Sequence, residues 1–115
     1  MPPDCIFCRI ASGAIPTSLV YQNDHVVAFP DLHPQAPTHV LVVPRQHVAS
    51  LTELNDTNLA GELLLAVGEV ARRGGVADRG FRTIINTGEE GGQTVPHLHL
   101  HLLAGRKLAE GSLGG

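Results

Sequence analysis

Three histidines near the end of the chain alternate strictly with leucines. They are His97, His99 and His101 in the stretch PHLHLHLLAGR, which runs from Pro96 to Arg106. Strict period-two alternation predicts a half-buried β-strand, because successive side chains of a strand point to opposite faces. The leucines between them would then face the core. The three imidazoles would share the other face at a spacing of about 6.5 Å, twice the rise per residue.

Three imidazoles on one strand face are compatible with several chemistries. Ordinary surface histidines are one reading, which the strict pattern disfavours. A second is a zinc site, in which a catalytic metal would take three protein ligands and a water. A third is nucleophilic catalysis at phosphorus, because neutral imidazole can attack a phosphate ester or phosphoramidate and form a nucleotidyl-histidine that water cleaves. Flanking histidines and backbone N–H groups would stabilise the developing charge.

The surrounding sequence adds further candidates. The glycine-rich stretch EEGGQT precedes the histidines, and its turned backbone could form an anion cradle. Two more histidines, His39 and His47, flank the apolar stretch VLVVP, and Asp31 lies before a proline-rich loop. Cys5 and Cys8 form a CxxC, for which metal binding, redox chemistry and chance all remain open.

Composition limits the class of protein. A chain of 115 residues predicts a single domain over residues 1–115, with a loose tail over about 107–115. The net charge of −3 and the absence of a basic stripe argue against nucleic acid as partner, so a nucleotide ligand should be small. The apolar run LLLAV is too short to cross a membrane, and the first residues do not read as a signal peptide. We therefore expect a cytoplasmic protein with no membrane partner.

The pattern along the chain predicts two helices and five strands. DCIFCRIASG reads as a short helix capped by Asp4 and ended by Gly13, and LVYQNDHVVAF as a hairpin turning at Asn23-Asp24. HVLVVP and FRTIIN read as strands, and residues 56–73 as an amphipathic helix ended by two glycines. Short connections between strands favour an antiparallel sheet, hence an α+β fold.

These segments together resemble the histidine triad (HIT) family, whose motif alternates three histidines with apolar residues and reads HLHLHLL here. The similarity extends through CIFCRI, AFPDLHPQAPTHVLVVPRQH and NTGEEGGQTVPHLHLHLLAGR, and is greatest to the Hint branch of purine nucleoside phosphoramidases. The resemblance implies a HIT-like fold with a five-stranded antiparallel sheet and two helices. It also implies a homodimer whose sheets join, with the central helix at the interface. The implied reaction releases AMP or GMP from nucleoside 5′-phosphoramidates, with no cofactor required for catalysis.

The resemblance also assigns roles to individual residues. His99 matches the nucleophile, His97 and His101 match the histidines that orient it and contact phosphate, and His39 matches the histidine packed behind it. The remaining matches are substrate contacts. They comprise the loop against phosphate and leaving group (Gly92, Gln93, Thr94), a phosphate- or ribose-side amide (Asn86), the carboxylate for the ribose hydroxyls (Asp31), and the base pocket (Ile6, Phe7, Ile10, Leu32, Leu41). Thr94 stands where Hint proteins usually carry serine.

A structural zinc is implied by the same resemblance. Several bacterial HIT proteins, and the related hexose-1-phosphate uridylyltransferases, bind zinc through a CxxC and two histidines. The matching residues here are Cys5, Cys8, His47 and His97. Such a metal would be structural, since all four positions would be filled.

Two other functions remain open from the sequence. One is hydrolysis of dinucleoside polyphosphates on the same fold, and the other is nucleotide binding with vestigial activity. The final stretch LAEGSLGG lacks the aromatic tail of eukaryotic Hint proteins, so the preferred leaving group is also open.

Overall fold

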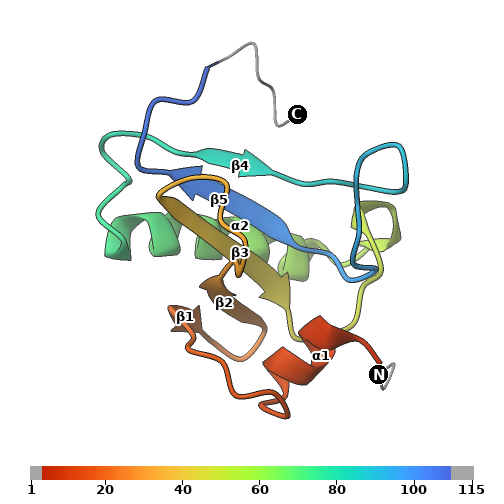
Figure 1. Cartoon of the computed structure of the whole chain (residues 1–115). Coiled ribbons are helices and arrows are strands. Elements are labelled where there is room, and N and C mark those ends of the chain that lie inside the picture. The colour runs from red at the N-terminus through yellow and green to blue at the C-terminus, as the bar shows by residue number, and fades with distance from the viewer. Residues whose placement is uncertain (1–3, 110–115) are drawn as a thin grey trace.

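The computed structural model describes residues 4–109, so most of the expected tail lies outside the described residues. Its elements follow the predicted order, with one additional short 3-10 helix (Figure 1). They are α1 (Ile6–Ala11), β1 (Tyr21–Gln22), β2 (Val26–Pro30), β3 (Thr38–Pro44), η1 (Leu51–Glu53), α2 (Thr57–Arg73), β4 (Arg82–Ile84) and β5 (Leu100–Ala104).

The five strands form one antiparallel sheet in the order β1-β2-β3-β5-β4. The α+β fold with two helices is therefore confirmed. The two strands that carry histidines, β3 and β5, are neighbours at the centre, and their register pairs His39 with Leu103 and Leu41 with His101. This register brings histidines from distant parts of the sequence onto one face of the sheet.

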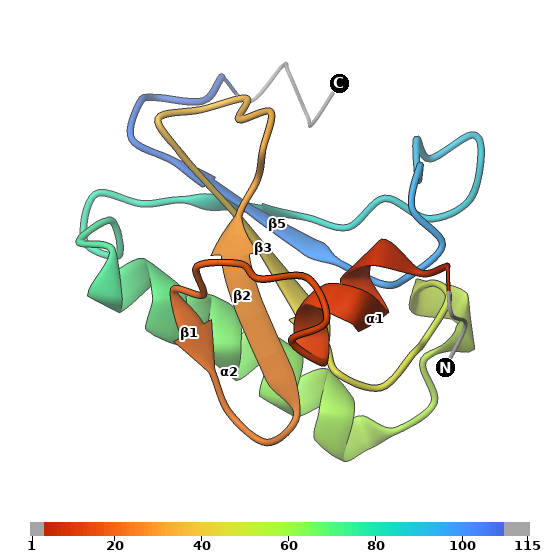
Figure 2. The ribbon, with the colours of Figure 1, turned by 60° about the horizontal axis from the view of Figure 1, so that its bottom comes forward.

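The two helices cover opposite faces of the sheet, with α2 behind it and α1 in front (Figures 1 and 2). Alternation along each strand decides which residues meet which helix. Val40, Val42 and the leucines of the histidine segment join the core beneath α2. Leu41 and Val43 instead join a second cluster with Phe7 and Cys8 of α1.

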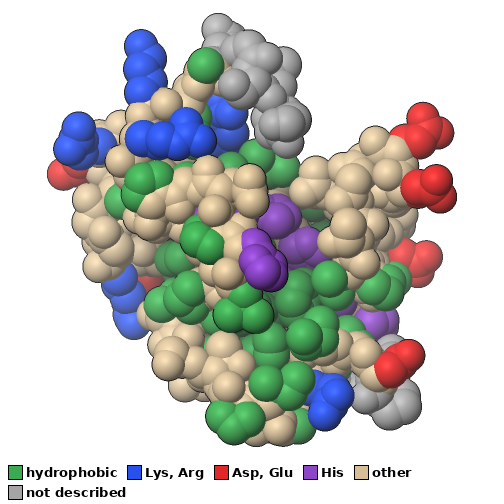
Figure 3. All heavy atoms as spheres, in the orientation of Figure 1, with side chains coloured by type: hydrophobic (Ala, Val, Ile, Leu, Met, Phe, Trp, Pro, Cys, Tyr) green, Lys and Arg blue, Asp and Glu red, His purple; other side chains and the backbone are tan. Residues whose placement is uncertain are grey.

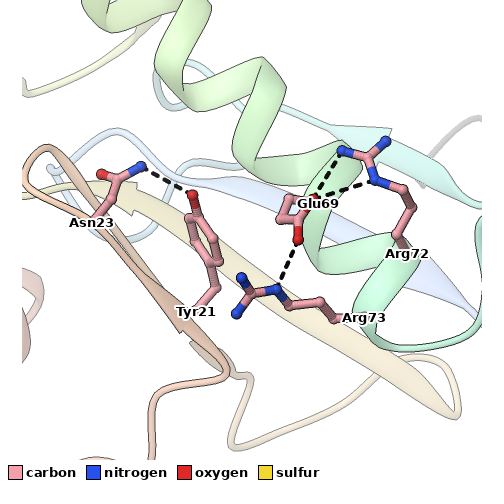
Figure 4. Close-up of polar contacts among 5 residues, drawn as sticks. All are labelled: Tyr21, Asn23, Glu69, Arg72 and Arg73. Atoms are coloured by element: carbon pink, nitrogen blue, oxygen red, sulfur yellow. Dashed lines mark hydrogen bonds and ion pairs between the residues drawn. The ribbon is translucent and has the colours of Figure 1, made fainter.

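The long helix α2 is fixed at both ends. Asp56 caps its start, because the Asp56 carboxylate accepts hydrogen bonds from the backbone N–H groups of Asn58 and Leu59. Near its end, Glu69 pairs with Arg72 and Arg73, and the Arg73 guanidinium lies 5.0 Å from the ring centre of Tyr21 (Figure 4). These contacts connect the helix end to the first strand of the sheet.

The predicted start of α1 was wrong by one residue. The cap is Cys5 rather than Asp4, because the Cys5 sulfur accepts a hydrogen bond from the backbone N–H of Cys8. Gly13 follows the end of the helix with a φ of 84°, as expected for a helix-terminating glycine.

The predicted histidine strand is shorter than its sequence pattern. Strand β5 begins at Leu100, so His97 and His99 precede it. These two histidines were expected on a half-exposed face, but they are 0% and 6% exposed because Phe7 of α1 packs its ring edge-to-face with both imidazoles. The expected orientation of Leu98, Leu100 and Leu102 toward the core is confirmed.

No helix among residues 4–109 is long and apolar enough to cross a membrane. The stretch FRTIIN contributes only Arg82–Ile84 to the sheet, where this strand forms one edge and β1 the other among the described residues.

Candidate active site and metal centre

The histidines gather at the middle of one face of the molecule, with apolar side chains below them and the glycine-rich loop to one side (Figure 3). The hydrogen-bond partners of each ring fix where its proton lies. A backbone carbonyl can only accept, so a ring nitrogen facing one carries the hydrogen. This rule assigns a different role to each histidine.

His99 has one nitrogen held and one left free for chemistry. Its Nδ1 lies 2.7 Å from the backbone oxygen of His97 and therefore donates to it. The proton of the neutral ring is thus on Nδ1, and Nε2 retains its lone pair. That is the tautomer an imidazole nucleophile requires.

His97 faces away from this chemistry. Its Nε2 donates to the backbone oxygen of Pro44 at 2.9 Å, which leaves Nδ1 as an acceptor. Nδ1 lies 3.3 Å from the Cys5 sulfur, 3.5 Å from the Cys8 sulfur and 3.2 Å from Nδ1 of His47. The pKa of His97 is lowered, mainly by burial, so the ring is neutral and able to bind a metal.

Four side chains here form a donor set that suits zinc. The sulfurs of Cys5 and Cys8 and the Nδ1 atoms of His47 and His97 all lie within 4.8 Å of one another. Burial and the neighbouring Cys5 raise the pKa of the Cys8 thiol to about 11, so only a bound cation would hold it as thiolate near neutral pH. Two sulfurs and two imidazole nitrogens are a set that zinc prefers in tetrahedral geometry.

Asp31, His39 and His101 form a second cluster of possible ligands, also within 4.8 Å of one another. Here the backbone N–H of Gln35 donates to Nδ1 of His39 at 2.9 Å, so the His39 proton is on Nε2. That proton lies between Nδ1 of His101 at 2.9 Å and a carboxylate oxygen of Asp31 at 3.4 Å. A metal would have to displace it, so this cluster is a hydrogen-bonded chain and not an open metal site.

Because Nδ1 of His101 accepts the hydrogen bond from His39, the proton of the neutral His101 ring is on Nε2. Burial and the nearby His99 and His39 lower the pKa of His101 to about 4, against the opposing effect of Asp31. Burial likewise lowers the pKa of His39. Both rings are neutral near pH 7, and Nε2–H of His101 can donate to a phosphoryl oxygen.

The glycine-rich loop is held in shape by its own side chains. Nδ2 of Asn86 donates to the Gly91 oxygen at 2.8 Å, and Oε1 of Gln93 accepts from the Gly88 N–H at 3.0 Å. Nε2 of Gln93 donates to two further carbonyls, so its side chain is fully used within the protein. Gly91 admits no side chain, because a Cβ there would collide with the backbone oxygen of Thr87. Any ligand contact from this loop would therefore come from groups other than the Gln93 side chain.

The predicted base-pocket residues are not all brought together. Phe7 and Leu41 lie in the cluster beneath α1, and Ile10 packs against it. Ile6 on the same helix is 45% exposed, and Leu32 is 87% exposed in the loop after β2. The apolar surface beside the histidines thus comes mainly from α1 and β3.

Two groups that fix the histidines were not identified from the sequence. The Pro44 carbonyl orients His97, and the Gln35 N–H orients His39. Both are main-chain groups, which every residue but proline carries in full, so residue type gives no signal for them.

Comparison with known proteins agrees with this geometry. Residues 12–108 match the model of the HIT domain. An uncharacterized HIT-like protein of Synechococcus elongatus is 50% identical over 95% of this chain and 96% of its own length. The purine nucleoside phosphoramidase of Escherichia coli is 39% identical over 94% of this chain and 92% of its own.

Solved structures give the same result. A histidine triad protein from Clostridium difficile superposes with a TM-score of 0.92 at 46% identity, covering 96% of this chain and 97% of that one. A HIT family hydrolase from Legionella pneumophila gives 0.89 at 39% identity, covering 93% and 97%. With the family model matching most of its length and its histidines converging as described, this chain belongs to the HIT family.

Proposed function

We propose that this protein hydrolyses purine nucleoside 5′-phosphoramidates, releasing AMP or GMP through a covalent nucleotidyl-histidine. The observation that carries the proposal is the hydrogen bond from His99 Nδ1 to the His97 carbonyl, which leaves Nε2 of His99 unprotonated. The name of the E. coli relative supports the choice of substrate.

The reaction would run in two displacements at phosphorus. Nε2 of His99 attacks, the P–N bond to the amine breaks, and its electron pair leaves with the nitrogen, which takes up a proton. Water then attacks the same phosphorus and loses a proton, and the bond to Nε2 breaks with its electron pair returning to the imidazole. The net products are a nucleoside monophosphate and a free amine, and no cofactor takes part.

Neighbouring groups would stabilise and place the phosphate. Nε2–H of His101 donates to a phosphoryl oxygen as charge develops there. Gly92, Gln93 and Thr94 are among the residues that line a hollow of about 540 Å³, and the backbone N–H groups of this loop and the Thr94 hydroxyl would contact the phosphate. Asn86 lies against the phosphate or ribose side.

The nucleoside would bind along α1 and the loop after β2. One oxygen of Asp31 already accepts from the His33 N–H, and the other has capacity to accept from a ribose hydroxyl. Phe7, Ile10 and Leu41 would contact the base by apolar surface, which discriminates weakly among purines.

We also propose a structural zinc on Cys5, Cys8, His47 and His97. When bound, the metal would cross-link α1 to the segment before β5 and keep both thiols as thiolates. The position of the nucleophile would depend on His97. Its ring is held between the metal site and the Pro44 carbonyl, and its own carbonyl accepts from His99 Nδ1.

A homodimer is proposed as well, with α2 at the interface. Leu64 and Leu65 on its outer face are 61% and 72% exposed, and β4 offers an edge strand among the described residues. Adjacent exposed leucines on a helix are typical of a surface that binds another protein.

The nucleophile is tested by His99→Ala. We expect AMP release from an adenosine 5′-phosphoramidate to fall at least about 1,000-fold, because the bond-forming nitrogen is lost. Rapid quench followed by mass spectrometry should detect adenylated His99 in the wild-type protein. The variant His33→Ala, which removes an exposed histidine, is the control and should form the same adduct. Unchanged turnover in a folded His99→Ala protein contradicts the proposal. Faster cleavage of diadenosine tetraphosphate than of the phosphoramidate favours a polyphosphate hydrolase instead.

Acidification is expected to destabilise the protein below pH 6.5. The pKa of His101 is about 4 in the folded state, whereas an unfolded histidine titrates near 6.5. Between these values the unfolded chain binds a proton that the folded chain does not. The free energy of unfolding therefore decreases as the pH is lowered, by up to about 1.4 kcal/mol per pH unit for one proton. Urea unfolding at several pH values measures this slope. It should be shallower in His101→Asn, and equal slopes would count against the assignment.

Zinc is tested by metal analysis together with unfolding. We expect one zinc per chain by elemental analysis, lost in Cys8→Ser. Chelation should lower the melting temperature before it lowers activity. Immediate loss of activity at an unchanged melting temperature would instead indicate a catalytic metal. A metal-free protein with wild-type stability would overturn the structural role.

The dimer is tested by Leu65→Asp. Placing a charge on the outer face of α2 should shift wild-type dimers to monomers in sedimentation velocity, because the carboxylate would have to be buried. Leu32→Asp, at an exposed position outside α2, is the matched control. A monomeric wild-type protein rejects the proposal outright.

A further inference from the structure

The two thiols of the Cys/His cluster lie close enough together to react with each other. Cys5 and Cys8 are the two cysteines of the chain, and both are free thiols. Their sulfurs lie within 4.8 Å of each other. The Cys5 sulfur also accepts a hydrogen bond from the backbone N–H of Cys8 at 3.4 Å, which holds it over the first turn of α1.

Burial gives the two thiols different access to solvent. Cys5 is 8% exposed and Cys8 is 2% exposed. A small oxidant that enters from solvent therefore reaches the Cys5 sulfur first. The thiol of another protein molecule is too large to follow it, so Cys8 is the partner within reach of an oxidised Cys5.

A disulfide between these cysteines and a metal on the same cluster exclude each other. Metals bind cysteine as the thiolate, and a sulfur in a disulfide carries no such charge. Bonded sulfurs lie about 2 Å apart, so at least one would leave its place beside Nδ1 of His97, now 3.3 Å and 3.5 Å from the two sulfurs. The two imidazoles that remain are fewer than the four ligands of a structural zinc site.

The same turn of α1 also carries the side chain that covers the proposed nucleophile. Phe7 lies between the two cysteines in the sequence. Its ring centre is 5.9 Å from that of His97 and 5.1 Å from that of His99. Drawing the two sulfurs into bonding distance would break the Cys5 cap and move this turn, and with it the ring packed against His99.

We propose that Cys5 and Cys8 form a reversible disulfide on reaction with a hydroperoxide, and that its formation releases bound zinc and slows the reaction at His99. The effect on His99 rests on the function proposed above. The disulfide itself does not, because it follows from the positions and the burial of the two thiols.

The oxidation takes place in two steps. The Cys5 sulfur attacks the hydroxyl oxygen of the hydroperoxide, the S–O bond forms, and the O–O bond breaks as the other oxygen leaves as an alcohol, or as water from hydrogen peroxide. The Cys8 sulfur then attacks the Cys5 sulfur. The S–S bond forms, and hydroxide leaves and takes up the thiol proton as water. The two thiols lose two electrons, which reduce the peroxide.

The test treats the wild-type protein, purified with its metal, with hydrogen peroxide. Mass spectrometry should show a loss of about 2 Da on the peptide that contains both cysteines, because two hydrogens are removed. A chromogenic chelator should detect about one zinc released per chain. AMP release from an adenosine 5′-phosphoramidate should fall about 10-fold, as when the support of a site is lost. A dithiol reductant and added zinc should restore it.

Two matched variants separate the roles of the thiols. In Cys8→Ser an oxidised Cys5 finds no thiol, so dimedone should label it as a sulfenic acid. In Cys5→Ser the more deeply buried Cys8 should be labelled about 10-fold more slowly. Whatever its level, the activity of either variant should not respond to peroxide. If a variant does not fold, the measurements on the wild-type protein decide.

The outcomes separate this inference from the proposed function. Two free thiols after peroxide treatment, a disulfide between two chains, or zinc retained on a protein with the Cys5–Cys8 disulfide overturns the inference. Unchanged activity of the disulfide form overturns the effect on His99. If the reduced protein cleaves no phosphoramidate, the proposed function fails, whereas the mass and the zinc release still test the disulfide.

Discussion

The hydrogen bond from His97 Nε2 to the Pro44 carbonyl is the contact on which the rest of the site depends. It ties the end of β3 to the segment before β5 and decides which His97 nitrogen faces the two cysteines. His97 is 0% exposed, so leaving that N–H unpaired would cost about 1–3 kcal/mol. The same residue's carbonyl then accepts the hydrogen bond from Nδ1 of His99, the proposed nucleophile. One buried histidine thus fixes both the donor set for a metal and the reactive tautomer of His99.

The sheet makes this arrangement possible by separating two kinds of side chain. Period-two alternation places the leucines of the histidine segment against α2, in the larger of the two apolar clusters. The imidazoles then lie on the α1 side, where Phe7 excludes water from His97 and His99. Burial lowers the pKa of His97, His39 and His101, so these rings stay neutral where charged ones would neither bind a metal nor accept a hydrogen bond at the required nitrogen.

Much of the fold followed from side-chain patterns, because alternation, glycines and apolar spacing are themselves the cause of strands, turns and an amphipathic helix. The order of elements and the extent of the long helix were of this kind. Errors arose where tertiary contacts decide. The cap is Cys5 and not Asp4, since the Cys5 sulfur accepts the Cys8 N–H, and His99 is buried because Phe7, 92 residues earlier in the chain, covers it.

The candidate site, too, has features that the sequence predicts and features that it does not. Which side chains gather was predictable from the motif and its resemblance, whereas their protonation was not, because it is set by carbonyl and amide groups of the main chain. His39 and His101 illustrate the difference. In the sequence they are two more histidines that could bind a metal, and they do lie within ligand distance of Asp31. A single N–H from Gln35 fixes the His39 proton on the nitrogen that faces them both.

That distinction assigns opposite roles to two clusters of similar composition. Around His97, the two imidazoles and the two thiols face one another, and the Cys8 N–H engages only the Cys5 sulfur, so the set can still take a cation. Around His101, the acceptors already share a proton, and the open side holds two guanidinium groups. Positive charge there disfavours a second cation and favours an anion. In the function proposed here, the first cluster would hold the framework of the site, and the second would face the negatively charged substrate.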